Sequence, residues 1–142
     1  MKKDTSTLTE ELDSCLDLSV FLRDNQDEMI AREVGSEIER IRKAKKISKV
    51  DLARKAEISE FYLYQVIGET RKPSRDKLLC LCLVLSCSAE ETDRLLRLAG
   101  HGNLYIRVKR DAIVQFALQH QWPLEELNQK LEDKAKHLYK SR

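Results

Sequence analysis

Apolar residues recur at intervals of three and four along most of the chain, and short polar stretches divide them into segments. This spacing predicts amphipathic helices. A serine followed three residues later by a carboxylate predicts a helix start at Ser36, Ser48 and Ser88. With the remaining apolar segments, the pattern predicts helices that begin near residues 10, 17, 36, 48, 59, 75, 88, 106 and 123.

The helix expected over residues 75–85 is apolar around most of its circumference, which predicts the buried centre of the fold. Residues 1–9 are polar and are expected to fray. Two helices are expected over residues 10–18 and 17–30. Their inward side chains are expected to be Leu12, Cys15, Leu16, Leu18, Phe21, Leu22, Met29 and Ile30. The last two helices are expected over 106–120 and 123–137. Their inward side chains are expected to be Ile113, Phe116, Ala117, Leu124, Leu127, Leu131, Ala135 and Leu138.

The stretch from Ser48 to Pro73 predicts two short helices joined by a turn. Leu52, Ala53 and Ala56 share one face of the first helix, and Leu63, Val66 and Ile67 point inward from the second. A small residue, Ala53, stands where two such helices would cross. This arrangement is typical of a helix-turn-helix, whose second helix enters the major groove of DNA.

These positions resemble the Cro/phage-repressor-type helix-turn-helix family, also called the XRE family. Counted from Lys49 as the first position, the fifth residue is small, and the fourth, eighth, tenth, fifteenth and eighteenth are apolar. The resemblance covers about residues 36–88, and RKPSRDKLL at 71–79 resembles the family's loop and fourth helix. Glu57 stands where the family usually has a glycine with positive φ, a departure that costs on the order of 1 kcal/mol.

The resemblance implies an all-α, lambda-repressor-like protein with a five-helix core at residues 34–100. An acidic helical arm would precede it at 1–33, and a helical extension packed on the core would follow at 101–142, where the segment LLRLAGHGNLYIRVKRDAIVQFAL resembles an extension of some bacterial proteins of this class. The implied function is sequence-specific binding of double-stranded DNA in transcriptional control, commonly as a homodimer that reads a palindrome.

The outward residues of the second helix are the candidates for reading bases. Gln65 could pair with adenine, Glu60 could accept a hydrogen bond from cytosine, and Phe61 could contact a thymine methyl group. The complete predicted base-reading set is Ser59, Glu60, Phe61, Tyr64 and Gln65. Tyr62 could face either the backbone or the core. By the resemblance, the residues that contact phosphates are Ser48, Lys49, Arg71, Lys72 and Ser74.

The charge distribution both supports and opposes DNA binding. Residues 36–77 hold 12 Lys and Arg against 7 Asp and Glu, whereas residues 1–35 hold 4 against 9. The basic excess therefore coincides with the predicted DNA-binding stretch. Glu57, Glu60 and Glu69 would repel phosphates, and an aromatic, acidic helix could instead serve a protein-protein interaction adaptor that kept the fold.

Two appendages have open roles. The acidic arm could shield the basic surface, bind a partner, or pack as a simple helical appendage with a charged outer face. The leucine stripe of the last helix could supply a dimer contact or be buried within one copy. The polar group of Tyr105, Arg107, Lys109, Arg110 and Asp111 could be a docking site, although an ion-paired helix start is favoured.

Other classes of function are disfavoured. Cys80, Cys82 and Cys87 lack a zinc-finger spacing, and Cys80 and Cys82 would point about 200° apart on a helix, so buried thiols are expected and no metal or cofactor. The sequence has none of the common catalytic motifs, so no enzymatic activity is expected. The chain also lacks a secretory leader and a long apolar run, which predicts a cytoplasmic protein with no membrane segment.

Overall fold

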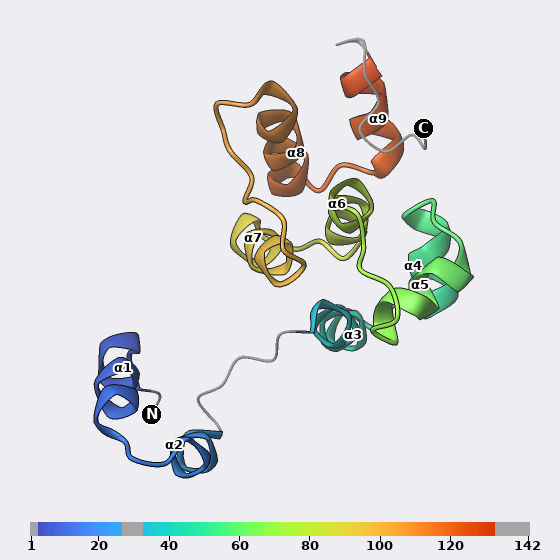
Figure 1. The fold of residues 1–142 in the computed structure, drawn as a ribbon. Coiled ribbons are helices and arrows are strands. Elements are labelled where there is room, and N and C mark those ends of the chain that lie inside the picture. Colours follow the sequence, from blue (N-terminus) through green and yellow to red (C-terminus); the bar gives the residue numbers. More distant parts are fainter. Residues whose placement is uncertain (1–2, 27–32, 133–142) are drawn as a thin grey trace. The chain divides into compact units, whose positions relative to one another are not determined.

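In a computed structural model, residues 3–26 and 33–132 are described, and the regular secondary structure in this part of the chain is all helical (Figure 1). The helices are α1 (Thr5–Ser14), α2 (Leu18–Asp24), α3 (Val34–Lys45), α4 (Lys49–Lys55), α5 (Glu60–Ile67), α6 (Arg75–Val84), α7 (Ala89–Leu98), α8 (Lys109–His120) and α9 (Leu124–Glu132). The predicted all-α class is confirmed. The chain divides into two compact units, residues 1–31 and 32–142.

The N-terminal unit is a pair of short helices with aspartate caps. Asp4 accepts a hydrogen bond from the backbone N–H of Thr7, so α1 starts well before the predicted residue 10. Asp17 caps α2 in the same way by accepting from the N–H of Ser19. The expected fraying of residues 1–9 is therefore wrong for the described residues from Thr5 onward.

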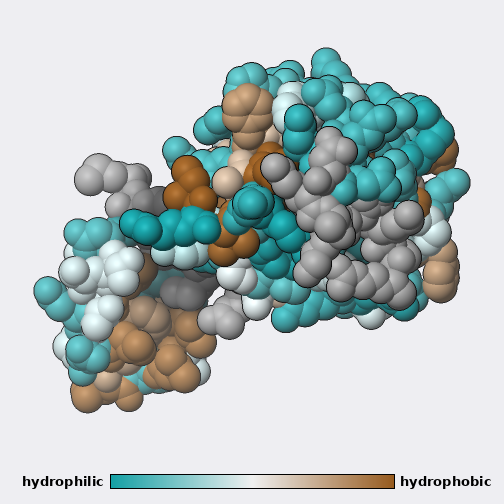
Figure 2. Space-filling model, turned by 90° about the horizontal axis from the view of Figure 1, so that it is seen from above, coloured by the Kyte–Doolittle hydropathy of each residue, from teal (hydrophilic) through white to brown (hydrophobic). Residues whose placement is uncertain are grey.

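Most apolar side chains of this unit lie on its surface, contrary to the sequence-based expectation. Leu12, Leu16, Leu18 and Leu22 are exposed, and Phe21 is the one apolar side chain buried among the described residues of the unit. Figure 2 shows hydrophobic side chains gathered on this unit. The reason is size, because two helices of 10 and 7 residues cannot surround a core. Met29 and Ile30 lie outside the described residues.

The C-terminal unit packs around α6. Helices α4, α7, α8 and α9 all contact α6, and every residue from Leu78 to Leu83 is buried. The prediction of a central buried helix is therefore confirmed. Cys80, Cys82 and Cys87 belong to this core, as the sequence predicted. None of the helices in the described ranges has the length and apolar character that a membrane crossing requires.

Helix α3 begins at Val34, three residues before the first helical residue that a cap at Ser36 predicts. Gly35 lies against the end of α5, where an added Cβ would come within 2.2 Å of the Val66 carbonyl oxygen. The Glu69 carboxylate accepts hydrogen bonds from the Ser36 N–H at 2.9 Å and from the Ser36 hydroxyl at 3.3 Å. The helix start is therefore satisfied by a side chain from beyond α5, so Ser36 is not the cap.

The region between α7 and α8 is held by a buried carboxylate. Asp111 is only 6% exposed and accepts two hydrogen bonds from the Arg75 guanidinium, at 3.1 and 3.0 Å. It also accepts from the Tyr105 N–H at 2.9 Å. The favoured interpretation of an ion-paired helix start is thus what the structure shows, and α8 begins at Lys109 rather than at 106 or 107.

The last two helices differ in how well their inward faces were predicted. Leu124, Leu127 and Leu131 of α9 are buried in the core of a single copy, so this stripe is unavailable as a dimer contact. On α8 the buried side chains include Val114 and Ala117, whereas Phe116 is exposed, contrary to expectation. Ala135 and Leu138 lie outside the described residues. The domain boundaries at residues 33/34 and 100/101, between arm, helix-turn-helix domain and extension, stay a prediction.

Candidate nucleic-acid interface

Local caps position the two helices of the helix-turn-helix. The Ser48 hydroxyl accepts a hydrogen bond from the Asp51 N–H at 3.1 Å and starts α4. The Ser59 hydroxyl accepts from the Tyr62 N–H at 3.0 Å and starts α5. Each serine satisfies a backbone donor that the helix itself cannot pair. The sequence therefore sets both starts locally, as predicted.

The turn between these helices takes the left-handed conformation that the resemblance implied for Glu57. Glu57 has a φ of 57°, in the left-handed region. The chain closes there through hydrogen bonds from the Glu57 N–H to the Arg54 carbonyl and from the Ile58 N–H to the Ala53 carbonyl. Ala53 and Leu63 are fully buried, so α4 and α5 pack closely enough to fix the turn despite its cost.

Helix α5 presents one face to solvent. Phe61 is 70% exposed and Tyr64 is 48% exposed, which is unusual for aromatic side chains and leaves them available for a partner. Ser59 and Glu60 are also exposed, and Gln65 is partly exposed. The five predicted base-reading residues thus all lie wholly or partly in solvent, and the opposite face, with Leu63 and Val66, is buried.

Tyr62 connects the end of the helix-turn-helix to the next helix. Its hydroxyl accepts a hydrogen bond from the Ser74 N–H at 3.1 Å. The Arg71 guanidinium and the Lys77 ammonium lie over its ring, 5.2 and 5.5 Å from the centroid. Sequence reasoning left the orientation of Tyr62 open, because its partner lies twelve residues away and no local pattern signals the contact.

The predicted phosphate-contacting residues lie at several places on the C-terminal unit. Ser74 is exposed at the start of α6, where its hydroxyl accepts from the Lys77 N–H. Arg71 stacks on Tyr62, whereas the Lys72 ammonium lies beside Gly100, within 2.6 Å of where a Cβ would stand. Tyr62 therefore brings Arg71 and Ser74 together, and Lys72 turns toward the end of α7.

Ser48 and Lys49 lie at the start of α4 on the other side of the turn. The Lys49 ammonium is 3.9 Å from the Glu39 carboxylate and 5.4 Å from the centroid of the Tyr64 ring. Lys49, one of the predicted phosphate-contacting residues, therefore lies beside the exposed face of α5. Glu39 is itself held by Arg42 at 2.7 Å, a hydrogen bond that lowers the pKa of the Glu39 carboxyl below its ordinary value.

The carboxylates that seemed to oppose DNA binding differ in their surroundings. Glu69 has a φ of 64° and turns its carboxylate to the start of α3, where Ser36 donates to it. Glu69 is nevertheless exposed, so the expectation that its carboxylate faces phosphates stays a prediction. Glu57 and Glu60 are both exposed, at the turn and at the first residue of α5.

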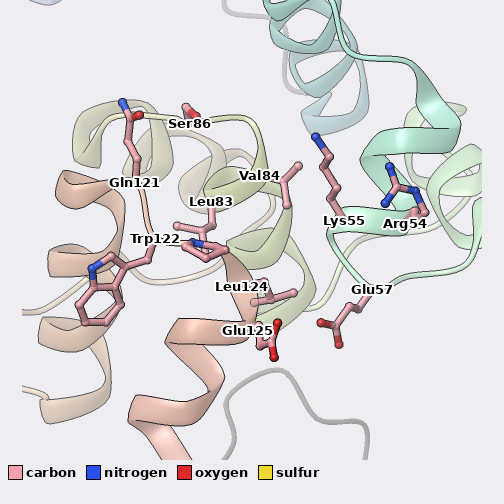
Figure 3. A pocket seen from close by; sticks show the side chains of 11 residues that line it. Arg54, Lys55, Glu57, Leu83, Val84, Ser86, Gln121, Trp122, Leu124 and Glu125 are labelled. Atoms are coloured by element: carbon pink, nitrogen blue, oxygen red, sulfur yellow. The ribbon is translucent and has the colours of Figure 1, made fainter.

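A groove of about 540 Å³ lies behind the turn, between the α4 end and the start of α9 (Figure 3). Its walls carry both charged and apolar side chains, including Lys55, Glu57, Trp122 and Glu125. Figure 3 shows Lys55 and Glu57 on one side, with Leu83, Val84 and Leu124 on the other. The cations and carboxylates of this wall balance, so the groove shows no preference for one sign of ligand charge.

Metal chemistry finds no support in the described ranges. They hold no group of three or more His, Cys, Asp and Glu residues that could bind an ion. Burial raises the pKa of the Cys80 thiol well above its ordinary value, which keeps that sulfur protonated. Cys82 behaves in the same way because a hydrogen bond with Cys87 and burial both raise its pKa.

Comparison with known proteins identifies this region. Residues 37–91 match the family model of the Cro/C1-type HTH DNA-binding domain. The match spans α4 and α5 with their turn, and includes every residue predicted to read bases or contact phosphates. A search of curated proteins and a search of solved structures found no match.

Proposed function

We propose that this chain, whose residues 37–91 form a Cro/C1-type helix-turn-helix domain, is a sequence-specific transcriptional regulator that binds double-stranded DNA. The observation that carries the proposal is the exposed face of α5. Phe61 and Tyr64 remain in solvent while the opposite face of the helix is buried. Such a helix can enter a major groove without disturbing its own packing.

In this proposal the exposed face of α5 reads base edges. Gln65 offers a bidentate pair to adenine, Glu60 accepts from the amino group of cytosine, and Phe61 contacts a thymine methyl group. Ser59 and Tyr64 are exposed beside them. A good bidentate pair discriminates against a wrong base by roughly 1–3 kcal/mol.

Phosphates would be held on both sides of α5. Ser48 and Lys49 act at the start of α4, and Arg71, Lys72 and Ser74 act after α5. Tyr62 positions two of these groups, because it accepts from the Ser74 N–H and lies under the Arg71 guanidinium. We further propose that the regulator acts as a homodimer on a palindromic operator in a bacterial cytoplasm.

The test is selection from a random DNA library at two salt concentrations, followed by sequencing. We expect an enriched palindrome, with affinity that falls as salt rises by about 0.9 log units per log unit of salt for each phosphate that the protein binds. Absence of any enrichment and of retention even at low salt would overturn the proposal.

Two variants separate the two kinds of contact. Arg71→Ala with Lys72→Ala should weaken binding to every sequence and flatten the salt slope by about 0.9 for each phosphate that is no longer bound. Gln65→Ala should instead relax the preference at one base position. Lys130→Ala, an exposed cation on α9 outside the matched domain, is the control and should leave affinity and slope unchanged.

A further inference from the structure

The N-terminal unit carries its apolar side chains on the outside. Leu16 is fully exposed, and Leu12, Leu18, Val20 and Leu22 are each more than a third exposed. Figure 2 shows such hydrophobic side chains gathered on this unit. Leu18 and Leu22 are four residues apart in α2, so they share one face of that helix.

Polar contacts connect the helices of this unit. The Lys3 ammonium donates to the Glu11 carboxylate at 2.7 Å and to the Asn25 side-chain oxygen at 2.7 Å. Asn25 is 3% exposed, and its amide donates to the Phe21 carbonyl at 3.0 Å. Polar contacts and the buried Phe21 ring therefore stabilise this unit, and among its described residues Leu12, Leu16, Leu18 and Leu22 stay exposed.

A unit of this size needs help to remain folded. Domains below about 40 residues usually rely on disulfides, a metal or association. Residues 1–31 contain one cysteine, Cys15, so they cannot form an internal disulfide. No metal-binding group occurs among the described residues, which leaves association through the exposed apolar face.

We propose that this face binds the same face of a second copy, which makes the α1–α2 pair the dimer interface. Val20 lies on the opposite face of α2 and is left out. At roughly 30 Å² for each methylene-sized group, the exposed parts of Leu12, Leu16, Leu18 and Leu22 amount to on the order of 300 Å². A specific interface buries about 800 Å² per partner, a little over half of it apolar. The patch therefore supplies most of the apolar area that one side of a stable dimer needs.

A second copy fits this patch because a two-fold interface needs only one self-complementary surface. The α9 stripe of Leu124, Leu127 and Leu131, which the sequence offered as a possible dimer contact, is buried within one copy. The inference rests on the proposed function only for the use of the dimer on a palindrome. The association itself follows from the composition of the N-terminal unit.

The charge of the patch predicts a distinctive salt response. Residues 3–26 hold six carboxylates against two cations, a net charge of −4. Two such units repel each other across the interface, so added salt screens the repulsion and strengthens the dimer. DNA binding has the opposite response, because salt weakens contacts between cations and phosphates. Salt would also weaken the binding of a partner that has a basic docking surface.

The experiment is sedimentation equilibrium of the full chain without DNA, across a wide dilution series at low and high salt. We expect a monomer–dimer equilibrium that shifts toward dimer as salt rises. Leu16→Glu with Leu22→Glu should weaken it by about tenfold or more, because four carboxylates then enter an apolar contact. Both side chains are exposed in one copy, so the fold of residues 32–142 should be unchanged by circular dichroism.

The matched control is Ile106→Glu, which places a carboxylate on an isoleucine that is 67% exposed in the C-terminal unit. This variant should dimerise like the unaltered chain. A monomer at every concentration and salt, a dimer that survives the double variant, or a dimer that weakens as salt rises would each overturn the inference. A dimer that selects no DNA would overturn the proposed function and leave the interface standing.

Discussion

The N-terminal unit and the C-terminal unit place the same kinds of residue in opposite environments. In residues 32–142 the leucines of α6 and α9 are buried, and α6 is contacted by four other helices. Among the described residues of the N-terminal unit, Leu12 of α1 and Leu18 and Leu22 of α2 are exposed, and Phe21 is buried. Both units have well-capped helices, so capping alone does not decide burial. The number of helices that can surround an apolar side chain decides it.

The contrast between the two units is tested most strongly by truncating one leucine in each. Leu81 in α6 is fully buried, so Leu81→Ala should lower the free energy of unfolding of the C-terminal unit by about 2–5 kcal/mol. Leu18 in α2 is 59% exposed, and Leu18→Ala should leave that unfolding free energy unchanged. Urea unfolding followed by the fluorescence of Trp122, the single tryptophan, measures both. Equal destabilisation by the two variants would contradict the contrast.

A smaller effect is expected from the buried charge of the C-terminal unit. Asp111→Asn removes the charge that pairs with Arg75, and should lower the free energy of unfolding by roughly 3 kcal/mol. Asp51→Asn is the matched control, because Asp51 pairs with Arg54 on the surface and its removal should have no measurable effect. Thermal unfolding of both variants would show whether the buried Asp111–Arg75 pair contributes more to the free energy of unfolding than the surface pair does.

The smallest effect concerns pH. The hydrogen bond from Arg42 lowers the pKa of Glu39 in the folded chain below the ordinary value of 4.5. The unfolded chain therefore binds a proton first, so this stabilisation is present above about pH 4.5 and is lost as pH falls through the lower, folded pKa. Glu39→Gln should make the melting temperature fall less steeply in that acidic range. An identical pH profile in both chains would show that Glu39 contributes nothing to acid unfolding.

Much of the helix-turn-helix was predictable because its determinants are local. Ser48, Ser59, Ser74 and Ser88 each accept a hydrogen bond from a backbone N–H three residues ahead, and each starts a helix as the sequence predicted. The left-handed turn at Glu57 was expected only from the resemblance to the helix-turn-helix family, which usually has a glycine with positive φ at that position. Which residues contact DNA stays a prediction.

Only the tertiary structure decided the features whose partners lie far along the chain. Glu69 reaches the start of α3 across 33 residues, and Arg75 reaches Asp111 across 36. An apolar stripe likewise predicts a buried face but says nothing of whether a neighbour exists to cover it. The α9 leucines pack against other helices and are buried in the core, whereas Leu16 and Leu18 are exposed. The sequence by itself determined the helices and the turn, because these form within a few residues, and packing decided which faces they bury.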